Sequence, residues 1–166
     1  MSRKFQLTVL SALMAGAFVF TGNVASADSA QEYKAAMKPL LPTIERWVGD
    51  VRNVVGYAVV RPELACTIDN VTLAREGESL AADLRGSRDE TPLGLQYAHD
   101  NLTVAVDHMT YAVSQTCADA HLAYYRVGGE LDRYDTASGK LDNFVSGRFT
   151  RPPFQGSTPD QPGSVN

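Results

Sequence analysis

The sequence has few of the side chains on which most protein chemistry depends. It contains three histidines, two cysteines and one tryptophan among 166 residues. It has no Gly-x-Ser-x-Gly segment to hold a nucleophilic serine and no glycine-rich, lysine-containing loop to bind phosphate. It also has no Cys-x-x-Cys-His for covalent haem attachment and no Glu-x-x-His pair of the di-iron bundle type. These absences argue against the common hydrolase, nucleotide-binding and metal-bundle classes, and we expect no catalytic activity.

Long apolar runs are also scarce, and the clearest one lies at the N-terminus. This run, residues 7–20, is shorter than the ~20 residues that a membrane-spanning helix needs. It follows a basic start and precedes the small residues at 25–27, a pattern that signal peptidase cleaves. Residues 1–27 therefore predict a signal peptide, with an uncleaved N-terminal anchor as the alternative. We expect the mature chain to begin at Asp28 and to be exported to the periplasm or the extracellular space.

Positive charge is in short supply in the mature chain. Removing residues 1–27 leaves 139 residues and reduces the 15 basic residues to 13, against 19 acidic ones, for a net charge of −6. Such a surface repels nucleic acid and anionic membranes, so we expect neither as a partner. No second apolar run approaches spanning length, so we expect no transmembrane segment in the mature chain. The length suits one helical domain, residues 28–150. Residues 151–166 are rich in proline, glycine and serine and predict a disordered tail.

The sequence does contain strong helical periodicity. Apolar residues recur every three or four positions, whereas the alternation typical of strands is weak throughout. A first helix is expected to begin at a capping box formed by Ser29 and Glu32 and to end at Pro62. Pro39 and Pro42 interrupt its apolar stripe and predict a kink or a restart.

Three further helical segments are expected after the first. The second spans about 62–84 and includes Gly77, at a cost of ~1 kcal/mol. The third begins with Thr91 as its N-cap, and its 3.5-residue apolar repeat is typical of antiparallel bundles. The paired glycines Gly128-Gly129 should break or bend it, leaving a shorter fourth helix near 130–145. The fold predicted is all-α, an antiparallel bundle of three to four helices, with a core that contains Ile44, Trp47, Val51, Leu102, Val106, Met109, Val113 and Tyr124.

The two cysteines provide a test of this arrangement. In an exported protein one pair of cysteines usually forms a disulfide, and two free thiols are the alternative. Across an antiparallel hairpin that turns near residue 90, facing residues have numbers that add to roughly 176–184. Cys66 and Cys117 meet this condition. We predict that they form a disulfide at the end of the hairpin far from its turn, closing a loop of about 50 residues.

Histidine and methionine are the residue types here that could ligate a metal or haem. The candidates are His108, Met109 and His121, all within the expected third helix. At 100° per residue, His108 and His121 lie about 140° apart on one helix and cannot share a metal there. We therefore predict no metal site and no cofactor. A small-ligand carrier, with haem or a metal held near these residues, is the alternative function.

Tyrosines offer a different kind of site. Tyr97, Tyr111 and Tyr125 are spaced fourteen apart and are expected on one stripe beside the apolar seam. An apolar ring with a polar tip suits a ligand or partner groove, although packing against the first helix near Trp47 and Tyr57 is the simpler explanation. We interpret the chain as an exported, non-catalytic helical protein that acts as a protein- or envelope-interaction module.

Overall fold

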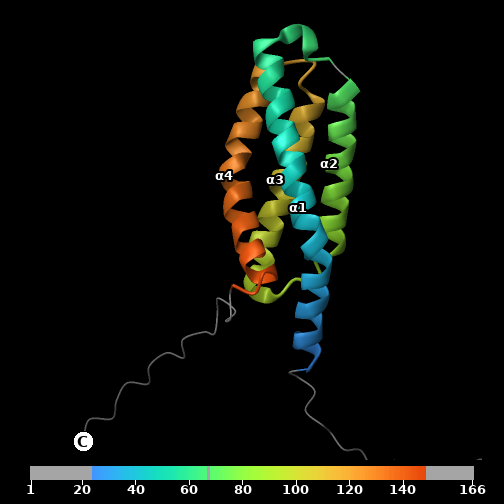
Figure 1. Cartoon of the computed structure of the whole chain (residues 1–166), viewed down its shortest axis with the longest axis vertical. Helices are drawn as coiled ribbons and strands as arrows, with labels where there is room; N and C mark the ends of the chain where they lie inside the picture. The colour runs from blue at the N-terminus through green and yellow to red at the C-terminus, as the bar shows by residue number, and fades with distance from the viewer. Residues whose placement is uncertain (1–23, 67, 149–166) are drawn as a thin grey trace, which may run out of the picture.

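The protein is a four-helix bundle. A computed structural model describes residues 24–66 and 68–148, and no strand occurs among them. The elements are α1 (Val24–Val60), the 3₁₀ turn η1 (Pro62–Leu64), α2 (Ile68–Gly86), the 3₁₀ turn η2 (Leu93–Leu95), α3 (Gln96–Ser114) and α4 (Ala120–Val145). Successive helices run in opposite directions (Figure 1). The predicted all-α antiparallel bundle is confirmed.

Two sequence predictions concern residues that lie mostly or wholly outside this range. The predicted signal peptide covers residues 1–27, of which only 24–27 are described, at the start of α1. The predicted disordered tail, residues 151–166, lies outside the described residues. Among the helices of residues 24–148, none combines the length and the apolar character needed to cross a bilayer.

Of the kink or restart predicted at Pro39 and Pro42, the restart is wrong, because α1 is one uninterrupted helix of 37 residues. Each proline removes the amide that would bond to the carbonyl four residues earlier, here those of Ala35 and Lys38. All four of these residues are exposed, which lets water satisfy the freed carbonyls. The helix also begins upstream of Ser29, so the predicted capping box does not form its start.

The core lies along the axis shared by the four helices. α3 packs mainly on α2 and α4, while α1 packs on α4 and α2 and meets α3 only narrowly across the bundle. Seven of the eight predicted core residues are buried, but Tyr124 is 53% exposed. On α4 the inward positions are instead occupied by Ala123, Val127 and Tyr134, among others. The prediction for Tyr124 failed because it extended the seam of the third helix across a turn.

That turn is the largest departure from the predicted layout. The third helix was expected to reach the paired glycines, but α3 ends at Ser114 and α4 begins at Ala120. Asp119 caps α4, and its side chain accepts a hydrogen bond from the Leu122 amide at 2.8 Å. Gly128-Gly129 lies inside α4 and does not break it. The apolar spacing continues through the turn, which is why periodicity alone did not reveal it.

The second helix and the start of the third also differ from prediction. The segment expected as one helix over 62–84 is divided into η1 and α2. Thr91 does not cap α3, which begins at Gln96; its hydroxyl instead donates to the Ser87 carbonyl at 3.0 Å. η2 lies between this turn and α3 and buries Leu95.

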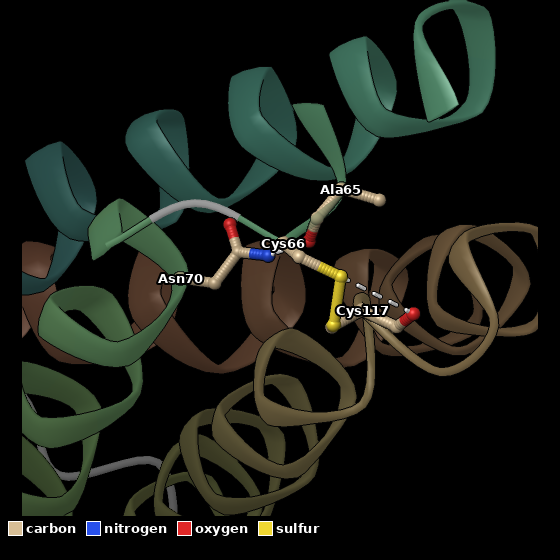
Figure 2. Close-up of a disulfide and its surroundings, with 4 residues drawn as sticks. All are labelled: Ala65, Cys66, Asn70 and Cys117. Atoms are coloured by element: carbon tan, nitrogen blue, oxygen red, sulfur yellow. Dashed lines mark hydrogen bonds between the residues drawn. A yellow bond between two sulfur atoms is a disulfide. The ribbon is translucent and has the colours of Figure 1, made fainter. Parts of the chain in front are cut away.

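The predicted disulfide is confirmed. Cys66 and Cys117 are bonded, with Cα atoms 4.5 Å apart (Figure 2). Each cysteine lies in a turn, Cys66 just before α2 and Cys117 between α3 and α4, so the bond joins two turns at one end of the bundle. Beside it the Asn70 side-chain amide donates to the Ala65 carbonyl, which fixes the first turn of α2 against the chain that precedes it.

Candidate functional site

The outward side of the α3–α4 pair carries several exposed tyrosines. Tyr97, Val104 and Tyr111 recur every seventh residue, so they follow one line along α3. Tyr97 is 77% exposed and Tyr111 is 56% exposed, and on α4 Tyr125 is 75% exposed. The expected packing of these tyrosines against the first helix is therefore wrong. The expected single stripe is also wrong for Tyr125, because the turn after Ser114 places that residue on α4. We call this surface the α3/α4 face; it is formed by Tyr97, Val104, His108, Tyr111, Leu122, Tyr125, Arg126, Arg133 and Lys140.

A cation–π contact joins the two helices within this face. The Arg126 guanidinium lies 5.2 Å from the centre of the Tyr111 ring. Such a contact contributes about 0.5–1 kcal/mol at an exposed site, and here it holds the guanidinium over the Tyr111 ring. Among the described residues Arg126 has no carboxylate partner at ion-pair distance. Its charge therefore remains available to a molecule that docks on the face.

One turn farther along the helices, a histidine is paired with a carboxylate. His108 Nδ1 lies 2.8 Å from Glu130 Oε1, and Arg133 Nη1 lies 2.5 Å from Glu130 Oε2. Glu130 is only 15% exposed, whereas His108 is 57% exposed. In the neutral imidazole this contact places the proton on Nδ1, because a carboxylate can only accept, and it leaves Nε2 as the free acceptor. The pair was not anticipated because both the helix boundaries and the α3–α4 register were needed to find it.

The predicted ligand-binding residues are dispersed. Met109 is fully buried, while its neighbour His108 is largely exposed, so the two side chains lie on different sides of α3. His121 lies in the first turn of α4, about 14 Å along the helix from Glu130, the partner of His108. Within the described parts of the chain, no group of three or more histidine, cysteine or acidic side chains is placed to hold a metal.

The other end of the α3/α4 face is hollowed. A groove of about 260 Å³ lies between the two helices and is lined by Tyr97, Asn101, Asp132, Arg133 and Lys140, among others. Lys140, like Arg126, has no carboxylate at ion-pair distance among the described residues. The face therefore has an exposed tyrosine and an unpaired cation at each end.

A larger hollow of about 550 Å³ lies between α1 and α4. It exists because Gly49 and Gly139 line it without side chains, and Arg52 pairs with Asp135 across it at 3.7 Å. Tyr134 also lines it, and burial raises the pKa of that phenol. These exposed ion pairs and glycines are typical of a solvated helix surface, and we assign no ligand to this hollow.

No known protein family, curated protein or solved structure matches this chain.

Proposed function

We propose that this chain is an exported, non-catalytic helical protein that binds a protein partner through its α3/α4 face. The partner segment presents carboxylates beside apolar side chains. The observation that supports this proposal is the exposure of Tyr97, Tyr111 and Tyr125 on two adjacent helices, with Arg126 lying over one of the rings.

Exposed tyrosine and arginine are the residue types that contribute most to protein interfaces. A tyrosine buries a large rigid surface on binding while losing the freedom of only two side-chain torsions. Arginine pairs with carboxylates through two parallel hydrogen bonds. Tyr111 and Arg126 are already in contact before a partner arrives, which lowers the entropy lost when the face becomes covered.

The charges on the face favour an acidic partner, although the chain as a whole is acidic. Glu130 is occupied by both His108 and Arg133, and the other carboxylate on this side of α4, Asp132, lines the groove without an ion pair to Arg126 or Lys140 among the described residues. Arg126 and Lys140 are fourteen residues apart on α4, which corresponds to about 21 Å. A helical or extended acidic segment of that length can reach both. Because these charges are exposed, the association should weaken as salt is added.

Export is supported by two observations. The pattern of residues 1–27 is typical of a signal peptide, and the chain's two cysteines are joined as Cys66–Cys117. A structural disulfide of this kind is typical of proteins that fold outside the reducing cytoplasm.

The experiment compares partner binding by two matched variants. The partner is recovered by crosslinking from the native host and its affinity is then measured with purified proteins. The double substitution Tyr111→Ser with Arg126→Gln should weaken binding by about tenfold or more, because it removes a stacked aromatic and its charge. Tyr57→Ser, which removes a tyrosine of α1 that is 66% exposed, should leave the affinity within about twofold.

Two results would contradict the proposal. One is an equal loss of affinity in the Tyr57 variant and in the α3/α4 variant. The other is a Soret band or stoichiometric metal in the protein purified from its host, lost on replacing His108 or His121; this would support the carrier alternative.

A further inference from the structure

A fully buried histidine connects three helices at the end of the bundle opposite the disulfide. His99 Nε2 lies 2.9 Å from the Leu84 carbonyl oxygen, and His99 Nδ1 lies 2.9 Å from the Tyr33 hydroxyl. Neither His99 nor Tyr33 has any exposed surface. A carbonyl can only accept, so Nε2 must carry the proton; Nδ1 is then the acceptor for the Tyr33 hydroxyl. In the neutral imidazole both ring nitrogens are therefore satisfied.

The residues around His99 come from all four helices. Tyr33 belongs to α1, Leu84 to the last turn of α2 and His99 to the first turn of α3. Phe144, near the end of α4, completes the group, with its ring centre 6.2 Å from that of Tyr33. The Cys66–Cys117 bond lies at the opposite end, beside the start of α2 and the end of α3. One end of the bundle is thus closed covalently and the other by neutral hydrogen bonds.

We propose that His99 is a proton-sensitive lock whose protonation opens the Tyr33 end of the bundle while the disulfide end stays closed. An imidazolium carries hydrogen on both ring nitrogens, so Nδ1–H would donate to the Tyr33 oxygen and the phenol would have to direct its own hydrogen elsewhere, toward Thr91. This exchange would still leave a full positive charge at a position with no exposed surface, and that buried charge is the main cost of protonation. The least costly relief is separation of the N-terminal part of α1 from the α2–α3 turn.

The surrounding charged groups do not stabilise the imidazolium enough to offset its burial. Burial lowers the pKa of His99, and the hydrogen bond to the Leu84 carbonyl and the nearby Asp100 only partly oppose this effect. Asp100 is itself paired with Arg88 at 2.6 Å, and that guanidinium also disfavours a charged His99.

The groups from α1 and α4 do not supply a compensating negative charge either. Burial raises the pKa of Tyr33 well above its ordinary value, so the phenol stays neutral. From α4 the group contains the uncharged Phe144 ring, and the nearby charge from α1 is the Lys34 ammonium, 4.8 Å from that ring centre. Protonation of His99 is therefore coupled to opening.

The sign of the pH effect follows from the lowered pKa. In the unfolded chain His99 takes up a proton near its ordinary value of 6.5, whereas in the folded protein it does so only at lower pH. The contribution to stability is complete above that value and is lost as the pH falls through the window below it. Within this window the folding equilibrium constant should fall by up to about tenfold per pH unit.

The test is urea unfolding of the mature protein, followed by the fluorescence of Trp47, at about pH 7.5 and about pH 5.5. The wild type should lose about tenfold in its folding constant between these conditions. His99→Gln, which cannot take up a proton in this range, should lose less than about twofold. His121→Gln, which replaces an exposed histidine, should retain the wild-type loss. Equal pH dependence in the wild type and in the His99 variant would overturn the proposal.

A second measurement keeps the proposal testable if the His99 variant does not fold. Hydrogen exchange of the wild type, corrected for the intrinsic effect of pH, should show protection falling at about pH 5.5 in residues 29–41, 84–99 and 141–148. Residues 68–74 and 109–114, near the disulfide, should remain protected. A uniform loss of protection, or nitrogen NMR shifts showing that His99 titrates near its ordinary pKa in the folded protein, would overturn it.

Discussion

Gly77 of α2 lies directly against Thr110 of α3. A methyl group placed on Gly77 would lie 2.1 Å from Thr110 Oγ1 and 2.5 Å from Trp47 Cζ2. Neither neighbour can easily move. The Thr110 hydroxyl donates to the Val106 carbonyl at 2.7 Å, and the Trp47 indole donates to the Leu73 carbonyl at 2.9 Å. The glycine that looked like a cost to the second helix is therefore required by the packing.

This relationship predicts opposite effects for two glycine substitutions. Gly77→Ala should lower the free energy of unfolding by about 1–3 kcal/mol, because the overlap outweighs the gain in helix propensity. Gly129→Ala should raise it by about 0.5–1 kcal/mol, since that glycine is exposed within α4 and has no atom within 4 Å of an added methyl group. Urea unfolding measures both values. Stabilisation by Gly77→Ala would show that the helices do not approach so closely.

The disulfide should contribute substantially to stability without being needed for the fold. The bond joins residues 51 apart, for which loop closure in the unfolded chain corresponds to about 4 kcal/mol. Replacing both Cys66 and Cys117 by alanine should lower the unfolding free energy by up to this amount. The circular dichroism spectrum at low temperature should remain helical. A double variant with unchanged stability would contradict this account of the bond.

Substitutions at Tyr124 and at Leu141, a buried residue of the same helix, test whether Tyr124 lies outside the core. Leu141→Ala should cost about 2–5 kcal/mol, because Leu141 has no exposed surface and its removal leaves a cavity. Tyr124→Ala should cost well under half as much, since more than half of that side chain is exposed. Comparable losses in the two variants would place Tyr124 in the core after all.

Tyr33→Phe isolates the hydroxyl that bonds to His99. The phenylalanine ring fills the same space, so the main change is a buried His99 Nδ1 acceptor without its donor. We expect a loss of about 1–3 kcal/mol in the free energy of unfolding at neutral pH. Thermal or urea unfolding at about pH 7.5 provides the measurement. A neutral effect would mean that the hydroxyl does not bond to His99 in solution.

Periodicity predicted which residues form the core but not where the helices end. Val106, Met109 and Val113 are buried as expected, because a 3.5-residue repeat specifies a helix face wherever the helix continues. The same repeat passes through the turn at 115–119, so it could not locate the turn. The sequence did contain one signal for this turn. Asp119 is a favoured N-cap residue, and its side chain accepts a hydrogen bond from the amide three positions later.

The spacing of residues could predict only those features of the site that lie on a single helix. The tyrosine stripe along α3 follows from spacing alone, but its exposure depends on which helices cover α3. The contacts Tyr111–Arg126 and His108–Glu130 join residues 15 and 22 positions apart on antiparallel helices. Their pairing requires the α3–α4 register, which was hidden by the missed turn. His99 shows a related limit, since nothing in its spacing distinguished a hydrogen-bonded core histidine from an apolar seam position.

Site-specific photocrosslinking in the native host tests the central claim most directly. A photoreactive phenylalanine is placed at Tyr97 or Tyr125 on the α3/α4 face, and at Tyr57 or Val71 as exposed controls on α1 and α2. We predict one protein partner crosslinked from both α3/α4 positions and not from the controls, through a segment rich in aspartate and glutamate. Crosslinking from the controls alone, equal crosslinking from all four positions, or capture of a basic segment would contradict the assignment of this face as an acidic-partner interface.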